Sequence, residues 1–563
     1  MSTSLLAAIV TAAVVFAEHV DAADACRTGA RLLRDATSLA QVRESIDVAC
    51  PCDAYARPDG SGRSRYRRCA QSVVAGAVAR GALRRECRET ATRGFLETTC
   101  GTTDRIACGR VTPTPRGDRG TCRITAPASC RARGLFTETP CIAETHCADV
   151  VERTGGTCVA PPPESPYGPG WSAVHADAAN TDYSPIRGAT DLKLAWQIRL
   201  DGAINLGPTS DDRGRVYVTD NSNDAACHLH VLDGATGDTL WCSSEVDRFA
   251  VASSPLLDRD GRVFLADGEA MHAFDPDGHV LWETPIVGVP LSAQFTPSGH
   301  LLFITHIGRV YVLRRDTGSL ALPVLELIPG RTWSPAESMV ACLRGTSGCP
   351  SANTLAVDSR TGRFYFTFFA PDAAQAGVRA MQYVDVPTPA LIPLWTNDDL
   401  PGGSASSPAL SADGSRVYVT DNVDGMHALD AATGARIWRF PIGDAPGGSP
   451  SLSPDGVLMP SGSATGALLA LRDDGDAATL LWSRDELLNR GVPTQAAGGL
   501  SYATVSAGGY LNDLVVVDTA TGAELDRERL PGTTVFTVGT TVMADGTVLV
   551  PTFLGQLFAF RPE

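Results

Sequence analysis

Residues Arg416–Trp438 have the sequence RVYVTDNVDGMHALDAATGARIW, and the fold can be predicted from this segment. A short run of β-branched and aromatic residues comes first, and a second apolar run ends at Asp430. A Thr-Gly turn follows, and the next run carries Trp438. Alternation with a period of two, interrupted by glycine turns, is typical of half-buried antiparallel strands. The stretch therefore predicts the second, third and fourth strands of one antiparallel sheet.

The same order of strands and turns recurs along the last two-thirds of the chain. The position of Trp438 repeats mostly at intervals of about 40–45 residues, which is the length of one four-stranded propeller blade. It is occupied in turn by Trp196, Trp241, Trp282, Leu320, Trp395, Trp438, Trp482 and Leu525. These eight units predict an all-β fold, an eight-bladed β-propeller of four-stranded antiparallel blades.

The two ends of the repeat predict how the ring closes. The last unit reaches the C-terminus after only three strands, whereas Asp191–Trp196 precedes the first complete unit. This N-terminal strand can complete the last blade, which would leave neither edge unpaired. We therefore expect a closed propeller over residues 170–563. An open solenoid or separate sandwiches are the alternatives.

Two motifs in this region resemble a known family. The repeat Leu-Asp-x-x-Thr-Gly-x-x-x-Trp, seen at Leu429–Trp438, resembles the tryptophan-docking motif of the pyrroloquinoline-quinone (PQQ)-like propeller superfamily. The opening segment Trp171–Pro185, WSAVHADAANTDYSP, is also similar to the start of those propellers. The resemblance covers about residues 170–563 and implies the fold. It leaves the activity open, because the superfamily includes quinoprotein dehydrogenases and non-enzymatic members such as an outer-membrane assembly lipoprotein.

The first 25 residues predict an export signal. Leu5–Ala17 is apolar but too short to span a bilayer as a mature helix, and small residues follow it, although no Lys or Arg precedes it. We expect an exported protein, either periplasmic, secreted or on the cell surface. Asp24 and the distance from the apolar run argue against a lipid anchor at Cys26. No other segment approaches membrane-spanning length.

Twelve of the 16 cysteines lie between Cys26 and Cys158. Dense, even-numbered cysteines in an exported chain predict disulfides, whose pairing the sequence leaves open. Zinc binding through Cys50-Pro-Cys52 or His146-Cys147 is the alternative, but a repeated Cys-x-x-Cys frame is missing. We expect a disulfide-stabilised domain at residues 26–158, with helices near 28–48 and 64–88 and loop-like chain from 112 to 158. A proline-rich linker at 159–169 follows.

The other four cysteines form two local pairs, and both are disulfide candidates. Cys227 and Cys242 are predicted to bridge a hairpin, and Cys342 and Cys349 to close the largest loop. The long insertions fall in connections that meet at one end of the ring. They are Asp220–Ala226, Pro323–Pro350, Phe369–Gly377 and Arg484–Gly499. Because binding residues concentrate on variable loops over a rigid scaffold, this end is the predicted working face; neutral loop growth is the alternative.

Charge and histidine placement exclude some functions. Residues 24–160 hold 22 Arg against 15 Asp and Glu, a net charge of +7, whereas the whole chain carries −16. The propeller is therefore acidic, which argues against nucleic acid as its ligand. His230, His272 and His427 share one position of the third strand, which Tyr311, Phe558, Leu469 and Val515 fill in other blades. A position that accepts Leu and Val predicts packing between blades rather than metal binding.

No catalytic, cofactor or metal residue is assigned from the sequence. The dehydrogenases that the chain resembles hold PQQ between a Trp and a disulfide of adjacent cysteines, with Ca²⁺ on Glu, Asn and Asp. This chain has no adjacent cysteines, and no Gly-x-Ser-x-Gly nucleophile elbow. We predict an exported, non-catalytic binding or scaffolding protein that recognises a protein, glycan or small ligand. The alternative is a PQQ- and calcium-dependent periplasmic alcohol or sugar dehydrogenase.

Overall fold

The computed structural model divides the chain into two compact units, Met1–Ala160 and Pro161–Glu563. It describes residues 26, 28–57, 61–114, 118–131, 137–141, 145–154, 156–158, 164–223, 225–334, 344–346, 350, 353–385, 388–463 and 465–563. The expected export signal at residues 1–25 lies outside the described residues. Within them, the search for a helix with the length and apolar character of a membrane span finds none.

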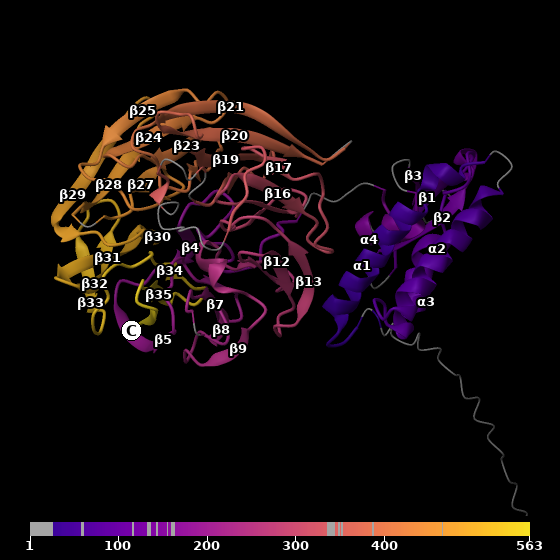
Figure 1. The fold of residues 1–563 in the computed structure, drawn as a ribbon, viewed down its shortest axis with the longest axis horizontal. Helices are drawn as coiled ribbons and strands as arrows, with labels where there is room; N and C mark the ends of the chain where they lie inside the picture. Colours follow the sequence, from indigo (N-terminus) through magenta and orange to yellow (C-terminus); the bar gives the residue numbers. More distant parts are fainter. Residues whose placement is uncertain are drawn as a thin grey trace, which may run out of the picture. The chain divides into compact units, whose positions relative to one another are not determined.

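The second unit is a propeller whose blades follow one another around a ring (Figure 1). In its described residues, eight antiparallel sheets run in chain order. The first four are β6 (Thr209–Ser210), β7 (Arg215–Thr219), β8 (Leu229–Asp233), β9 (Thr239–Ser243); β10 (Leu256–Leu257), β11 (Val263–Ala266), β12 (Ala270–Phe274), β13 (Val280–Pro285); β14 (Gln294–Phe295), β15 (Leu301–Ile304), β16 (Arg309–Leu313), β17 (Leu325–Glu326); β18 (Ala356–Val357), β19 (Arg363–Phe368), β20 (Ala376–Val384) and β21 (Ala390–Leu400). The eight-bladed all-β prediction is confirmed.

The remaining four sheets complete the ring. They are β22 (Ala409–Leu410), β23 (Arg416–Thr420), β24 (Gly425–Asp430), β25 (Arg436–Pro441); β26 (Ser451–Leu452), β27 (Val457–Met459), β28 (Ala467–Asp473), β29 (Ala478–Leu488); β30 (Thr494–Ala497), β31 (Leu500–Gly508), β32 (Leu511–Asp518), β33 (Glu524–Arg529); and β34 (Thr541–Val542), β35 (Val548–Pro551), β36 (Gln556–Pro562) with β5 (Leu192–Arg199). A short helix η4 (Arg248–Ala252) lies between two blades, and β4 (Tyr183–Arg187) pairs parallel to β30.

The ring closes through the two distant ends of the repeat. β5 pairs antiparallel with β36, and the register runs from Leu192 opposite Pro562 to Arg199 opposite Gln556. In Figure 1 the C-terminus lies beside β5. The last blade is therefore built from both ends of the propeller, as the three-strand final unit predicts.

The repeated tryptophan docks on the third-to-fourth turn of the following blade. Trp395 Nε1 donates a hydrogen bond to the Ala431 carbonyl at 3.1 Å, and its ring lies against Gly434. A Cβ atom at Gly434 would lie 2.4 Å from the indole, and φ there is +73°. The same indole N–H bond reaches the turn of the next blade from Trp196, Trp241, Trp282 and Trp482. The motif thus joins a Trp to a glycine in the neighbouring blade, and so links the sheets around the ring.

Replacing this docking glycine is expected to destabilise the propeller. Gly434→Ala would push a methyl group into the Trp395 ring, an overpacking that costs about 1–3 kcal/mol in addition to the strain of a positive φ. Gly499→Ala is the matched control, because φ there is +74° and the site around its missing Cβ is open to 4 Å. Chemical denaturation should show a larger loss for Gly434→Ala than for Gly499→Ala. Equal losses would contradict the docking role.

An axial segment, residues 166–184, fills the centre of the ring. The first strands of neighbouring blades contact one another, so they surround the axis. Backbone amides of these strands donate to carbonyls of the segment, as in Leu452 N to Thr181 O at 2.8 Å and Gln495 N to Asp182 O at 3.0 Å. The other such donors are Ser210, Leu257, Val357 and Leu410. Residues 166–168, placed by the sequence in the linker, also bond to the ring, where Gly168 N donates to Leu257 O at 3.0 Å.

The first unit combines helices with a small sheet. Its elements are α1 (Leu32–Ala49), η1 (Cys52–Tyr55), α2 (Gly62–Ala79), η2 (Arg85–Cys87), α3 (Arg88–Leu96), β1 (Ile106–Thr112), β2 (Arg119–Thr125), η3 (Pro127–Ser129), β3 (Thr137–Cys141) and α4 (Cys147–Thr154). The prediction of loop-like chain from 112 to 158 is wrong, because β2 and β3 flank β1 in an antiparallel sheet and α4 follows. The helix expected over 64–88 ends at Ala79.

Disulfides hold this unit together. The pairs are Cys26–Cys87, Cys50–Cys69, Cys52–Cys100, Cys108–Cys130, Cys122–Cys147 and Cys141–Cys158. All described cysteines of the chain are paired in this way. The zinc alternative is therefore wrong for Cys50, Cys52 and Cys147, since a disulfide sulfur is not available as a thiolate ligand.

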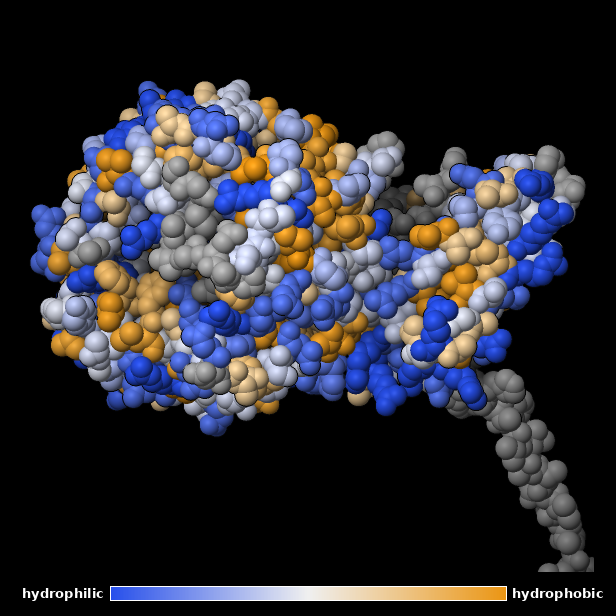
Figure 2. All heavy atoms as spheres, in the orientation of Figure 1, coloured by the Kyte–Doolittle hydropathy of each residue, from blue (hydrophilic) through white to orange (hydrophobic). Residues whose placement is uncertain are grey.

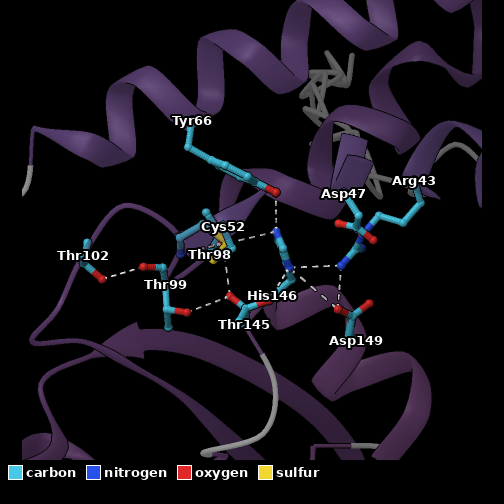
Figure 3. Close-up of a disulfide and its surroundings, with 11 residues drawn as sticks. Arg43, Asp47, Cys52, Tyr66, Thr98, Thr99, Thr102, Thr145, His146 and Asp149 are labelled. Carbon is cyan, nitrogen blue, oxygen red and sulfur yellow. Dashed lines mark hydrogen bonds and ion pairs between the residues drawn. A yellow bond between two sulfur atoms is a disulfide. The ribbon is translucent and has the colours of Figure 1, made fainter. Parts of the chain in front are cut away.

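A buried histidine network lies beside the Cys52–Cys100 disulfide (Figure 3). The Nε2 atom of His146 is 2.8 Å from the Tyr66 hydroxyl, and its Nδ1 atom is 3.0 Å from Nη2 of Arg43. Arg43 also donates to Asp149 at 2.6 Å. Burial, reinforced by the Arg43 charge, lowers the pKa of His146 to about 4. His146 is therefore a neutral, hydrogen-bonded core residue that joins α1, α2 and α4.

Candidate functional site

A pocket of about 390 Å³ lies at the ring axis, on the side of the long connections. Its wall comes from connections between blades, residues 205–207, 447–449, 490–492 and 536–541, and from the second-to-third connections at 461–463 and 553. The long insertions predicted from the sequence fall in these same two kinds of connection, those between blades and those between the second and third strands. The axial segment contributes Val174, His175 and Asp182 to the lining. The pocket thus has a fixed floor and a wall made of loops from several blades.

A histidine–aspartate pair anchors the floor. His175 Nδ1 is 2.7 Å from Asp182 Oδ2, and both side chains are buried. The other ring nitrogen, Nε2, is 3.0 Å from the Ser407 hydroxyl and 3.4 Å from the Ser449 hydroxyl. Burial raises the pKa of Asp182, and the His175 contact partly offsets that rise. One imidazole therefore ties the axial segment to two blades.

The order carboxylate, imidazole and hydroxyl is also that of serine hydrolases, but this arrangement differs at the nucleophile. Ser407 has no exposed surface and does not line the pocket. Ser449 does line it, but its hydroxyl accepts the Ser407 backbone N–H at 2.9 Å. We interpret His175 as a positioning residue that holds the floor in place.

Two side-chain polar atoms on the wall, Arg490 Nε and Ser461 Oγ, have no hydrogen-bond partner among the described residues. The Arg490 side chain donates from Nη2 to Ser506 Oγ at 2.9 Å, while its Nε atom is buried with no hydrogen-bond partner among the described residues. The Ser461 hydroxyl is likewise buried and unpartnered within that part of the chain, and the residue is only 8% exposed. Gly462 N donates to Gly491 O at 2.8 Å, so Ser461 and Arg490 lie on adjacent chain segments. Orphaned polar groups of this kind indicate a place where water or a ligand binds.

Two aromatic residues form the apolar side of the pocket. Phe553 N donates to Phe536 O at 3.2 Å, so the two residues lie on neighbouring connections. The Arg490 guanidinium lies over the Phe536 ring, 5.3 Å from its centre. Phe553 is 40% exposed, and other exposed apolar side chains on second-to-third connections are Val423 and Tyr510. Apolar and polar side chains are interspersed over the ring surface in Figure 2.

A second hollow, of about 760 Å³, lies on the opposite side of the axial segment. It is lined by that segment and by first-to-second turns, including Asp358 and Arg360. Two of its acidic groups bond within the protein, because Asp358 accepts from Arg360 at 3.1 Å and Asp177 from Thr181 at 2.7 Å. The axial pocket is therefore the better candidate site.

Of the predicted site residues, the described pair Cys227 and Cys242 does not line this pocket, whereas the predicted insertion Arg484–Gly499 contributes residues 490–492. Cys227 and Cys242 form a disulfide beside the β8–β9 pair. Cys342 and Cys349 lie outside the described residues. Arg484–Gly499 is only partly a loop, since β29 extends to Leu488 and β30 occupies Thr494–Ala497.

The three repeated histidines have a role that the sequence did not reveal. Nε2 of His230, His272 and His427 lies 2.6, 2.9 and 2.8 Å from Asp220, Asp267 and Asp421 respectively. Each pair belongs to a single blade, so the expectation of packing between blades needs correction. Burial alone would raise the pKa of Asp421, but hydrogen bonds from His427 and backbone amides lower it. In two blades the histidine position holds Tyr311 or Phe558, and Thr305 or Thr552 takes the place of the aspartate at the start of the turn.

The residues that build the pocket were missed for different reasons. His175 and Asp182 stand in the opening segment, and their seven-residue spacing became meaningful only when that segment was found at the axis. Ser461, Arg490 and Phe536 stand in connections that the repeat does not share. Arg490 does lie in the insertion Arg484–Gly499, which the sequence predicts at the working face, and this was the available signal.

The pocket lining does not fit the PQQ and calcium set that the resemblance implies. Among the described residues the lining contains no Trp, and its one carboxylate, Asp182, is bonded to His175. Calcium prefers several carboxylate and carbonyl oxygens, and this lining offers no second carboxylate among the described residues. We derive no quinone chemistry from these residues.

Comparisons with known proteins agree with the fold. Residues 188–323 and 392–562 match the family described as outer membrane protein assembly factor BamB. Protein Rv3035 of Mycobacterium tuberculosis is 30% identical over 398 residues, covering 70% of this chain and 96% of that protein. Serine/threonine-protein kinase AfsK of Streptomyces coelicolor is 26% identical over 52% of this chain and 38% of its own. Quinohemoprotein alcohol dehydrogenase from Comamonas testosteroni is 16% identical with a TM-score of 0.51, over 70% of this chain and 80% of its own, a likeness of fold alone.

Proposed function

Because the chain belongs to the PQQ-like propeller superfamily, through the family of outer membrane protein assembly factor BamB, we propose that it is an exported, non-catalytic binding protein. Its ligand is recognised in the axial pocket and by the loops around it. The protein supports this role as a rigid ring whose centre is blocked on one side by the axial segment. A ligand therefore enters from the loop-bearing end only.

The observation that carries the proposal is the axial pocket itself. Its volume, about 390 Å³, lies within the range of about 300–1,000 Å³ that small-molecule sites occupy. Mostly apolar lining with a few convergent polar groups is the usual composition of such a site. The unpartnered groups of Arg490 and Ser461 add to this support.

Export is supported by the cysteine chemistry. Seven disulfides lie in the described residues, six in the first unit and one in the propeller. Disulfides at this density persist in oxidising compartments and are rare in the cytosol. We propose a periplasmic, secreted or cell-surface location. The partner class, whether small molecule, glycan or protein, is decided by the experiment below.

A ligand screen with a pocket-filling variant tests the proposal. A Cβ at Gly448 would meet its nearest atom at 3.5 Å, so Gly448→Leu fits the backbone and fills the pocket. Thermal shift of the full chain with organic acids, sugars and peptides is expected to find a ligand that this variant loses. Ala432→Leu, on an exposed turn at the other end of the ring, is the control and should bind normally. Binding unaffected by Gly448→Leu would contradict the pocket, and PQQ uptake with Ca²⁺-dependent alcohol oxidation would contradict a non-catalytic role.

A further inference from the structure

We infer that Arg490 and Ser461 form an anion subsite that takes the carboxylate of a singly charged organic acid, whose apolar body lies against Phe536 and Phe553. The inference rests on the proposed function, since it assigns a ligand class to the same pocket. It depends on four features: an unpaired cation, an orphaned hydroxyl, the number of charges in the lining and an apolar wall.

The cation is Arg490, which is held in place by contacts that leave its charge uncompensated. Its Nη2 atom donates to Ser506, a neutral hydroxyl, and its guanidinium lies over the Phe536 ring. Its Nε atom is buried and has no hydrogen-bond partner among the described residues. Removal of a charged group from water is costly unless an opposite charge joins it, so this site favours an anion. A planar guanidinium binds a carboxylate through two parallel hydrogen bonds.

The hydroxyl is Ser461, which lies next to the arginine. The hydrogen bond from Gly462 to Gly491 fixes the two residues on adjacent segments. Ser461 Oγ would lie 3.6 Å from a Cβ at Gly448, so it faces the glycine stretch that also lines the pocket. Its Oγ has no partner within the described chain, which leaves its proton free for an acceptor on the ligand. A carboxylate satisfies both residues at once.

The number of charges limits the ligand to one negative group. The other ionisable residues of the lining are His175 and Asp182, which are bonded to each other at 2.7 Å. A single arginine therefore remains for the ligand. A tricarboxylate, such as PQQ or citrate, would bring two further negative charges into the pocket without partners, which is strongly unfavourable.

The apolar wall selects the rest of the ligand. Phe536, Phe553, Val492 and Val538 line the pocket beside the arginine. A sugar would leave these surfaces in contact with hydroxyl groups, whereas an alkyl or aryl chain would bury them. The expected ligand class is therefore an aliphatic or aromatic monocarboxylate.

The test compares matched probes on the full-length protein. 4-Phenylbutyrate, the uncharged 4-phenylbutan-1-ol and citrate are titrated by calorimetry. We expect 4-phenylbutyrate to bind at least about 10-fold more tightly than the alcohol, because a charge-assisted hydrogen bond exceeds a neutral one, and citrate to bind worse than either. Arg490→Gln should remove the preference for the acid but leave the affinity for the alcohol unchanged. Ser461→Ala should lower the affinity for the acid by about 3–10-fold. This substitution leaves the fold intact, because the Ser461 hydroxyl has no partner among the described residues.

The outcomes separate this inference from the proposed function. If the acid and the alcohol bind equally to the wild type, and Gly448→Leu abolishes both, the pocket stands and the anion subsite is wrong. The subsite is also wrong if the screen finds a sugar or peptide that needs Gly448 but ignores Arg490→Gln. A preference for citrate or PQQ over the monocarboxylate would overturn the charge argument.

Discussion

Deletion of residues 556–563, which removes β36, is expected to leave the propeller unfolded or aggregated instead of mildly destabilised. Leu557, Phe558 and Phe560 have no exposed surface. Burial of each such side chain contributes about 1.5–3 kcal/mol, so these three alone approach the whole stability of a typical domain, about 5–15 kcal/mol. The deletion also leaves β35 and β5 with unpaired edges, and open edges promote association between chains.

Size-exclusion chromatography with light scattering, near-ultraviolet circular dichroism and thermal melting would measure the effect of this truncation. The matched control is Lys193→Ala, which removes the ion pair of Lys193 with Glu563 at 2.8 Å, at the same seam but on its exposed surface. Since both side chains of that pair are in solvent, the melting temperature of the control should change little. A truncated chain that stays monomeric and melts like the wild type would refute closure of the ring by β5 and β36.

The propeller could be read from the sequence because its information is periodic and local. Each blade repeats a strand pattern of period two, and the glycine that must receive a tryptophan recurs with it, as at Gly434 and Trp395. Closure could be predicted because the final unit has only three strands and the segment before the first unit can supply the fourth. The periodic signal therefore specified the sheets, their order and the partner of the last strand.

The small sheet of the first unit was missed because its strands lack that signal. β1 and β2, with sequences IACGRVT and RGTCRIT, mix glycine, cysteine and arginine, and most of their side chains are only half buried. Disulfides such as Cys108–Cys130 and Cys122–Cys147 hold the sheet where a large apolar core is absent. Covalent cross-links leave no trace in hydrophobic periodicity.

The axial pocket was out of reach of the sequence for another reason. Its residues come from connections of different blades, and each is unlike its counterparts in the repeat. Ser407 and His175 meet although 232 residues separate them. Only the three-dimensional path of the axial segment brings such residues together. That path is set by backbone hydrogen bonds to the inner strands of the ring, and such bonds leave no sequence motif.

Loss of the imidazole at the pocket floor is the second change with a large expected effect. His175→Ala would leave the Asp182 carboxyl group buried without its partner, and would remove the contact between the axial segment and Ser407. Loss of one partner leaves the other buried polar group unsatisfied, which costs about 1–3 kcal/mol. Asp182→Asn keeps a hydrogen-bonding group beside Nδ1 and should lie between the wild type and His175→Ala.

A His–Asp pair whose histidine is exposed provides the control that separates burial of the imidazole from the contact itself. His279 Nδ1 lies 3.1 Å from Asp275, but the His279 side chain is 53% exposed, so His279→Ala should have little effect on chemical denaturation. Because the floor also shapes the pocket, His175→Ala should weaken ligand binding at temperatures where the ring is still folded, whereas His279→Ala should not. Equal stability of the two variants would mean that the axial segment is held by its backbone bonds alone. In that case the floor would be set by the inner strands, and the binding site would depend on His175 no more than on any exposed residue.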